Sequence, residues 1–271
     1  MFTRAIVCPP ASNFAEGLTT ADLGTPNYER ALKQHQDYCA ALEQCGLRLT
    51  RLALDPLHPD STFVEDTAIL AEALPHGRAS APASGNGRCA ILTRPGASSR
   101  RGEVESMRSV LANLFPALGE IQSPGTLDGG DVCEAGNHFF IGISERTNEA
   151  GAQQLAELLA RLGYTASLTD RRELRSILHL KSGLSYLGHN CQAVIKALAD
   201  RPEFCGYDLA RVNADETYAA NCIRVNDHLL VAAGYPTLEE TLRDLGHHTI
   251  ALEMSEFQKM DGGLSCLSLR F

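Results

Sequence analysis

Residues 25–46 carry the clearest hydrophobic pattern in the chain. Apolar side chains recur every three or four positions along this stretch, which is the spacing of an amphipathic helix. One face of that helix would carry Ala31, Leu32, His35, Tyr38, Cys39, Leu42 and Cys45. Thr25-Pro26 is a start signal and Gly46 a stop signal. The pattern therefore predicts a helix over 25–46.

Four further stretches show the same spacing with less regularity. Apolar faces recur over residues 99–119 and 147–163, and a weaker one over 190–206. In 236–246, Thr237 and Glu240 have the spacing of a capping box, and Gly246 closes the stretch. The chain is thus expected to contain five helices, spread evenly along its length.

Short extended runs fill the intervals between these helices. A first run follows each helix, a second follows the first, and in several places a third comes before the next helix. The second runs are "STFVEDTAIL", "TLDGGDVCEA", "LHLKSGLSYLG", "YAANCIRVN" and "GGLSCLSLRF". The order strand, strand, helix, strand recurs five times, with "RAIVCPP" supplying an N-terminal piece. Regular recurrence of one unit indicates an α/β fold repeated around an axis.

The repeat predicts a single domain over residues 1–271. Residues 71–87, "AEALPHGRASAPASGNG", interrupt it with a segment rich in Ala, Gly, Pro and Ser. This composition is typical of an extended or flexible loop. Because the segment separates two strands of one module, we interpret it as an insertion within the domain.

Composition narrows the classes of function. The 271 residues are 44% hydrophobic, which suffices for a packed core, and the net charge is −9. A polyanion binder would carry a basic excess, so the charge does not favour nucleic acid as a partner. The N-terminus has no apolar run of the kind found in signal peptides, and no stretch approaches the ~20 apolar residues of a membrane helix.

The nine cysteines are odd in number and scattered, without a C-x-x-C pair or the spacing of a zinc site. This usage is typical of reduced thiols in the cytosol and not of a disulfide framework. We therefore expect a cytoplasmic protein with free cysteines.

The repeat also predicts which side chains meet. In a closed ring of five modules, equivalent strand ends converge on the axis. The residues at those places are Asp60, Glu65, Asp66, Asp128, Asp131, His179, Asn221 and Cys266. Taken singly, Cys266 is typical of a buried structural thiol and His179 of a structural histidine. Together with carboxylates they form the set that nucleophilic catalysis needs: a nucleophile, a base and an orienting acid.

Five ordered motifs resemble one known family. "FVEDTAIL", "TLDGGDV", "LHLKSGLSYLGHN", "YAANCIRVN" and "MDGGLSCLSLRF" are similar to the motifs of dimethylarginine dimethylaminohydrolases, which belong to the guanidino-group-modifying penteins. The resemblance runs from "GLTTADLG" to Phe271, and only the 71–87 spacer departs from it. It implies a five-bladed α/β-propeller (pentein) fold. It also implies hydrolysis of Nω-methylated L-arginine to L-citrulline and a methylamine, without a cofactor or a metal.

The resemblance implies three catalytic residues. Cys266 would attack the central carbon of the guanidinium and form a covalent thiouronium-type intermediate. His179 would protonate the departing amine and then activate water. Asp128 would hold the imidazole or a guanidinium nitrogen; a local turn acceptor in "DGGD" is the alternative for this residue.

The resemblance also assigns the substrate contacts. The guanidinium would be bound by Asp66 and more weakly by Glu65, because a planar cation with several N–H donors needs more than one carboxylate. The α-amino group would be bound by Asp60 and the Leu18 carbonyl. The α-carboxylate would be bound by Arg100 and Arg146, with Arg101 as the alternative to Arg100. Ser265, with Gly262 and Gly263, suits a close approach of the backbone to the ligand.

Other functions remain open at this point. Deimination of arginine or a related guanidine would use the same residues, and amidino transfer would replace water by an amine. A ribosome-binding protein of the same fold would lack the Cys, His and carboxylate set. Cys266 and His179 could trap zinc adventitiously, although no closed four-ligand pattern is present. The expected partner is a small cationic amino-acid substrate, and neither nucleic acid nor a membrane is expected as a partner. The protein is expected to be a monomer or a homodimer.

Overall fold

A computed structural model of the protein describes residues 1–75 and 87–271. These residues form two compact units. The first unit consists of Met1–Val64 and Lys181–Phe271, and the second of Glu65–Leu180. The expectation of a single domain therefore stays a prediction, and the two units are described separately below.

The sheets of both units follow one plan. The described residues form five three-stranded sheets, in the orders β15-β1-β2, β11-β10-β9, β12-β13-β14, β3-β4-β5 and β6-β7-β8. In every sheet the central strand pairs antiparallel with one neighbour and parallel with the other. A helix connects each central strand to its parallel neighbour, as a parallel crossover requires. The strand, strand, helix, strand repeat predicted from the sequence is thereby confirmed.

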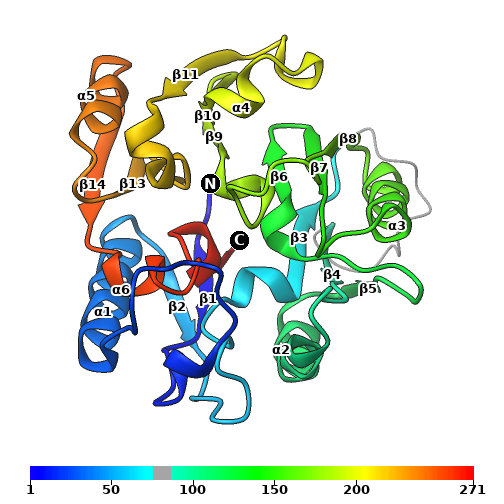
Figure 1. The fold of residues 1–271 in the computed structure, drawn as a ribbon. Coiled ribbons are helices and arrows are strands. Elements are labelled where there is room, and N and C mark those ends of the chain that lie inside the picture. The colour runs from blue at the N-terminus through cyan, green and yellow to red at the C-terminus, as the bar shows by residue number, and fades with distance from the viewer. Residues whose placement is uncertain (76–86) are drawn as a thin grey trace. The chain divides into compact units, whose positions relative to one another are not determined.

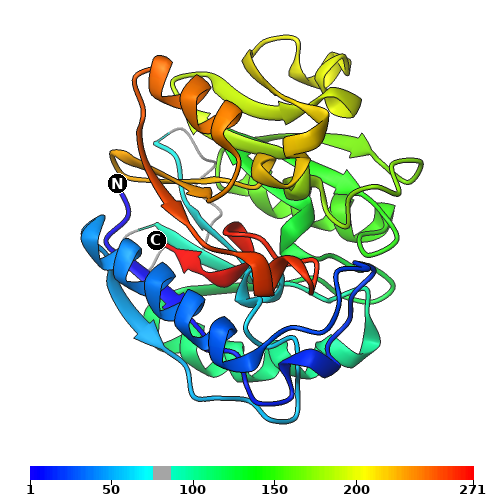
Figure 2. The same cartoon turned by 60° about the vertical axis from the view of Figure 1, so that its left-hand side comes forward.

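The first unit holds three of these sheets (Figure 1). Its strands are β1 (Arg4–Val7), β2 (Arg48–Arg51), β9 (Leu184–Gly188), β10 (Cys191–Ile195), β11 (Asp208–Val212), β12 (Ile223–Val225), β13 (His228–Ala232), β14 (His248–Leu252) and β15 (Leu269–Arg270). Its helices are α1 (Tyr28–Gln44), α4 (Lys196–Ala199), α5 (Pro236–Asp244) and α6 (Ser255–Gln258). Helix α1 contacts β2, β14 and α6 (Figure 2).

The second unit holds the other two sheets. Its strands are β3 (Ala68–Glu72), β4 (Arg88–Leu92), β5 (Ala117–Glu120), β6 (Val132–Ala135), β7 (His138–Ile143) and β8 (Thr165–Asp170). Its helices are α2 (Arg101–Leu114) and α3 (Glu149–Arg161), and α3 lies beside β7 and β8 (Figure 1). Each unit has its own buried apolar core.

The predicted insertion falls mostly outside the described residues. Residues 76–86 of the 71–87 segment are not described. At its start, Ala71 and Glu72 still belong to β3 and pair with Cys89 and Arg88 of β4.

The predicted helix over 190–206 is wrong for most of its length. Residues Cys191–Ile195 form β10, and only the short α4 follows. A two-residue turn joins β9 to β10, with φ of 49° at His189 and 61° at Asn190. Positive φ at both positions is the signature of a hairpin turn, and the β-branched Val194 and Ile195 then continue the strand.

The caps of two helices and the start of one strand also differ from the sequence pattern. Asn27, rather than Thr25-Pro26, caps α1 by accepting a hydrogen bond from Arg30 N. Helix α5 has no side-chain cap of its own. The Glu216 carboxylate instead accepts from the first-turn amides of Thr237 and Leu238, at 2.9 and 2.6 Å. Strand β5 begins at Ala117, inside the predicted helical stretch 99–119 and directly after the Pro116 that cannot continue α2.

Candidate active site

Tight 3₁₀ turns carry most of the candidate residues. Such a turn comes immediately or shortly before the strand that pairs antiparallel with the central strand in every sheet. The turns are Val64–Thr67, Gly129–Asp131, Leu180–Ser182, Ala214–Ala220 and Ser265–Leu267. They contain or adjoin Glu65, Asp66, Asp128, Asp131, His179, Asn221 and Cys266. The second extended runs of the sequence are thus turns followed by short strands, and the chemistry lies in the turns.

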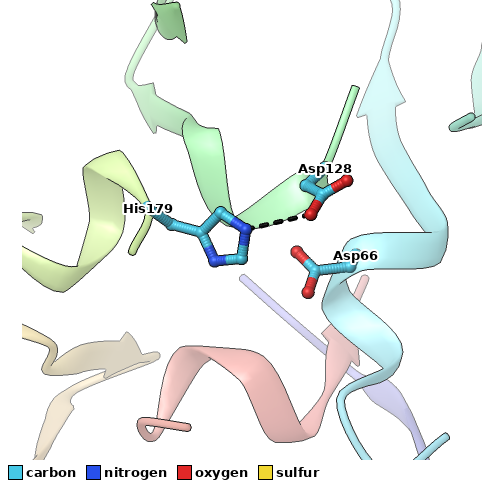
Figure 3. A group of neighbouring side chains, drawn as sticks. All are labelled: Asp66, Asp128 and His179. Carbon is cyan, nitrogen blue, oxygen red and sulfur yellow. Dashed lines mark hydrogen bonds and ion pairs between the residues drawn. The ribbon is translucent and has the colours of Figure 1, made fainter. Parts of the chain in front are cut away.

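Three candidate residues meet in the second unit. His179 Nε2 lies 3.0 Å from Asp128 Oδ2, and Asp66 faces the same ring (Figure 3). One polar atom from each of the three side chains lies within 4.8 Å of the other two. All three residues are buried, with exposed fractions of 6% or less. The structure therefore brings Asp66, Asp128 and His179 together, as the sequence predicts for these three.

Backbone amides fix both carboxylates. Gly130 N donates to Asp66 Oδ1 at 2.7 Å, and Gly96 N donates to Asp128 Oδ1 at 2.9 Å. A Cβ at Gly130 would lie 2.5 Å from His179 Nδ1, so only glycine permits this contact between backbone and imidazole. The "DGGD" motif is more than a local turn, because its second glycine makes room for the histidine.

The charges of the three residues are interdependent. Burial lowers the pKa of His179, but the charge of Asp66, the hydrogen bond to Asp128 and the charges of Asp131 and Asp128 raise it more, to about 9. Burial raises the pKa of Asp66, but the positive charges of His179 and Arg100 and the Gly130 hydrogen bond bring it down to about 2. At neutral pH the cluster therefore contains an imidazolium that can donate a proton.

Arg100 is part of this charge network. Its guanidinium pairs with Asp66 and with Glu103, and only 6% of the residue is exposed. Burial lowers the pKa of Arg100, but Glu103 and Asp66 raise it well above the ordinary value. The neighbouring Arg101 is exposed and donates to Pro95 O at 3.2 Å. Of the two candidates, Arg100 therefore lies beside the Asp66 cluster, while its contact with a substrate carboxylate stays a prediction.

Glu65 and Arg146 belong to the same unit. Glu65 is buried next to Asp66 in the turn Val64–Thr67. Arg146 is partly exposed, and its backbone packs so closely on Gly96 that a Cβ at Gly96 would lie 2.3 Å from Arg146 O. Glu103 was missed from the sequence, although it stands three residues after Arg100, a spacing that pairs side chains on a helix.

Cys266 lies in the first unit, in the 3₁₀ turn Ser265–Leu267. Its side chain is buried, with 9% of the residue exposed, and Gly263 N lies 3.4 Å from Cys266 Sγ. A Cβ at Gly262 would lie 2.3 Å from the Phe63 ring, and one at Gly263 would lie 2.6 Å from Asn221. Both glycines before the cysteine are therefore required by close packing.

Side chains from other segments hold this turn in place. Asn221 Nδ2 donates to Ser265 Oγ at 3.0 Å, and Ser265 N donates back to Asn221 Oδ1 at 2.9 Å. Tyr218 Oη donates to Gly262 O at 2.8 Å. Burial and the charges of Cys266 and Tyr235 raise the pKa of Tyr218 well above its ordinary value, so this phenol keeps its proton. Tyr218 is a further residue that the sequence analysis did not single out.

Asp60 and Leu18 also meet within the first unit. The Asp60 carboxylate accepts from Leu18 N, at 3.1 Å to Oδ1 and 3.2 Å to Oδ2. Asp60 is 5% exposed, whereas Leu18 is 40% exposed. A Cβ at Gly17 would lie 2.4 Å from Asp60 Oδ1, which explains the glycine before Leu18. Asp60 is thus buried and accepts a hydrogen bond from the 17–20 loop.

The Asp66, Asp128 and His179 cluster has the spacing of a metal site but not its charge balance. Three potential ligand atoms are close enough to share one ion. Both carboxylates, however, already accept backbone hydrogen bonds, and the Arg100 cation pairs with Asp66. A high histidine pKa also opposes metal binding, because a ligating imidazole must be deprotonated. The cluster suits proton transfer better than a metal ion.

Comparisons with known proteins agree with the resemblance seen in the sequence. No family model matches the chain. It is 41% identical to the N(G),N(G)-dimethylarginine dimethylaminohydrolase of Pseudomonas aeruginosa, over 100% of both chains. It is 33% identical to the protein of the same name from Streptomyces coelicolor, over 98% of this chain and 96% of the relative.

Solved structures give the same result. The chain matches the Pseudomonas aeruginosa enzyme, solved as a cysteine-to-serine mutant complexed with citrulline, with a TM-score of 0.92 and 39% identity over 100% of both chains. It also matches the N-terminal domain of ArgZ, a cyanobacterial arginine dihydrolase, with a TM-score of 0.81 and 18% identity over 98% of this chain and 97% of that one. The second likeness concerns the fold alone. Together they confirm the predicted α/β pentein fold.

Proposed function

Because the chain belongs to the N(G),N(G)-dimethylarginine dimethylaminohydrolase family, we propose that it hydrolyses Nω-methylated L-arginine to L-citrulline and a methylamine. The observation that carries this proposal is the buried His179 beside Asp66 and Asp128, with a pKa raised to about 9. A leaving amine needs a proton at the moment when its bond to carbon breaks. An imidazolium that persists at neutral pH can supply it.

The first chemical step forms a covalent intermediate. The Cys266 thiolate attacks the central carbon of the substrate guanidinium, and a C–S bond forms. The C–N bond to the methylated nitrogen then breaks, and this nitrogen takes the proton of His179. Dimethylamine or methylamine leaves, and the remaining group stays on Cys266 as an S-alkylthiouronium.

The second step returns the enzyme to its starting state. His179, now neutral, accepts a proton from a water molecule as that water attacks the same carbon. The C–S bond then breaks and Cys266 leaves as the thiolate, while the hydroxyl that came from water loses its remaining proton to solvent and becomes the ureido carbonyl of citrulline. One methylated arginine cation and one water are consumed, and one citrulline, one amine and one proton are formed; the proton binds the released amine in solution. Asp128 keeps the imidazole oriented through both proton transfers.

The remaining site residues are proposed to bind the substrate. Asp66 and Glu65 are assigned to the guanidinium, and Asp60 with the Leu18 carbonyl to the α-amino group. Arg100 and Arg146 are assigned to the α-carboxylate. Ser265, the residue before the nucleophile, is proposed to let the backbone of its turn approach the substrate closely. The family relationship supports this set, and so does the burial of Asp60, Glu65, Asp66 and Arg100.

The substrate class is a small amino acid. The Pseudomonas aeruginosa relative was solved with citrulline, and also as an adduct with S-methyl-L-thiocitrulline. Within residues 1–75 and 87–271, no helix has both the length and the apolar character needed to cross a membrane. We propose a cytoplasmic enzyme, monomeric or homodimeric, that acts without a cofactor and has neither nucleic acid nor membrane as a partner.

Citrulline release from three substrates tests the function. Purified protein is given asymmetric dimethylarginine, monomethylarginine or arginine, and citrulline is measured by a colorimetric or mass-spectrometric assay. We expect release from at least one methylated substrate at a kcat/KM well above that for arginine, and none from the Cys266→Ser variant. Preference for plain arginine would instead establish the deiminase alternative. Absence of citrulline from all three would refute both.

A further inference from the structure

Arg171 is a buried cation that the proposed chemistry does not use. It follows β8 directly and is 5% exposed. Its Nη1 donates to Ile177 O at 2.9 Å and to Leu174 O at 3.4 Å, and its Nη2 donates to Leu178 O. One guanidinium therefore binds three carbonyl oxygens of the segment that ends immediately before His179.

Asp131 holds the same segment from the other side of His179. It is fully buried and accepts from Leu180 N at 2.9 Å and from Arg171 Nε at 3.2 Å, both at Oδ1. Its Oδ2 accepts from Ser144 Oγ. The residues before and after His179 are therefore tied to one buried ion pair.

The Asp131 network also reaches the partners of His179. Ser144 Oγ accepts from Arg146 N and Thr147 N, both at 2.9 Å. Thr147 Oγ1 in turn accepts from Asp128 N at 3.1 Å. Asp131 thus connects the backbone around His179 with the backbone around Asp128, whose carboxylate contacts His179 Nε2.

The segment between β8 and the turn Leu180–Ser182 needs such support. Residues 171–179 contain no helix or strand, and most of residues 172–176 is exposed. The backbone of this segment makes turn-type hydrogen bonds, such as Leu174 N to Arg171 O at 2.7 Å, but it has no ladder, so contacts from side chains contribute to its position. Arg171 and Asp131 supply these contacts, because a planar guanidinium can donate in several directions at once.

We propose that the Asp131–Arg171 ion pair is a positioning element that fixes the imidazole of His179 against Asp128 for proton transfer. This inference rests on the proposed function, since it assigns His179 the role of acid and base. A displacement of about 1 Å in a reacting group can lower a rate by about 100-fold. The pair is therefore expected to act on the chemical steps and to leave substrate binding nearly unchanged.

Arg171→Lys is the principal test, and Arg172→Lys is its matched control. Lysine keeps the charge opposite Asp131 but lacks the fork that reaches three carbonyls. Arg172 is the adjacent residue, but its side chain is 53% exposed and pairs with Asp170 and Glu149 at the surface. We expect a loss of about 10- to 100-fold in kcat for Arg171→Lys with KM within threefold of wild type. We expect no change for Arg172→Lys.

Two further readouts separate positioning from a mere loss of folded protein. Rapid-quench mass spectrometry measures how fast the covalent intermediate forms and decays, and both rates should fall in Arg171→Lys because His179 is the acid of the first step and the base of the second. Histidine-selective ¹⁵N labelling then reports the ring nitrogens of His179, whose signals are identified by their loss in His179→Gln. These signals should shift in Arg171→Lys and stay in place in Arg172→Lys.

Two results would overturn the positioning role of the ion pair. They are an unchanged kcat in Arg171→Lys, and a lower kcat with His179 signals that do not move. If Arg171→Lys does not fold, Asp131→Asn is judged by the same readouts, because the amide keeps an acceptor for Leu180 N. A wild-type protein that releases no citrulline would refute the proposed function, and the His179 signals would still decide the positioning.

Discussion

His179 Nε2 and Asp128 Oδ2 lie 3.0 Å apart, so the imidazole is held by a carboxylate at one nitrogen while the other nitrogen lies against Gly130. The ring cannot rotate without losing that hydrogen bond. The proton on Nε2 is assigned from this contact, since Asp128 can only accept. Both features favour one orientation of His179.

Asp128→Asn is expected to move the alkaline limb of the pH–rate profile. The charge of Asp66 is the largest cause that raises the pKa of His179, to about 9. The hydrogen bond to Asp128 and the charge of Asp128 also raise it. With an amide at position 128 the imidazolium loses its proton at lower pH. The pH above which kcat/KM falls should therefore decrease. We also expect kcat to fall by about 100-fold or more, as is usual when a general acid is impaired. A profile identical to wild type would contradict the assignment of His179.

Stability should depend on pH on both sides of neutrality. The folded pKa of His179, about 9, lies above its ordinary value of 6.5, so its contribution is complete below pH 6.5 and is lost as the pH rises to 9. The folded pKa of Asp66, about 2, lies below its ordinary value of 3.8, so its contribution is lost as the pH falls from about 4 to 2. The free energy of unfolding in urea should be greatest between these ranges. In His179→Gln, the decline between pH 6.5 and 9 should be smaller; an equal decline would assign it to other groups.

Gly130→Ala is expected to inactivate the protein more than it destabilises it. The new methyl group would lie 2.5 Å from His179 Nδ1, so the imidazole must move. We expect a loss of about 100-fold in kcat. Gly206→Ala is the control, because nothing lies within 4 Å of its Cβ position. Comparable kcat values for the two variants would show that the contact between Gly130 and His179 is not needed.

Tyr218→Phe tests the support of the Cys266 turn. The change leaves the partly buried Gly262 carbonyl without its phenol donor, which costs roughly 1–3 kcal/mol. Tyr235→Phe is the matched control, since that phenol only accepts from Gln258 Nε2 at 3.2 Å in a partly buried place. Urea unfolding should show the larger loss for Tyr218→Phe, together with slower alkylation of Cys266 by a guanidine-like reagent. Equal losses in the two variants would remove Tyr218 from the account.

The repeat could be predicted from the sequence because each module has its own local signals. The periodic apolar face of α1 and the glycines that follow the helices are such signals. Neither signal depends on tertiary contacts. Strand β10 was missed because a short apolar run such as Ala193–Ile195 fits a helix or a strand equally well. The His189-Asn190 turn was the signal that could have decided it.

The chemistry of the site could be predicted by residue type but not by arrangement. Asp66, Asp128 and His179 meet as expected, yet the close contact of Gly130 with the imidazole has no periodic signature. The cap that Glu216 provides to α5 comes from a distant segment and leaves no local pattern. Likewise Arg171 lies next to a similar surface residue, Arg172, and only burial separates their roles.

If Cys266 binds the substrate carbon covalently during turnover, intact-mass spectrometry of the quenched enzyme will detect the adduct. Wild-type protein is mixed with asymmetric dimethylarginine and quenched in acid within milliseconds to seconds, and the adduct is located by peptide mapping among the nine cysteines. We expect an added mass equal to the substrate less dimethylamine, on the peptide that contains Cys266, and neither adduct nor citrulline in Cys266→Ser. An adduct confined to another cysteine, or undiminished citrulline release by Cys266→Ser, would contradict it.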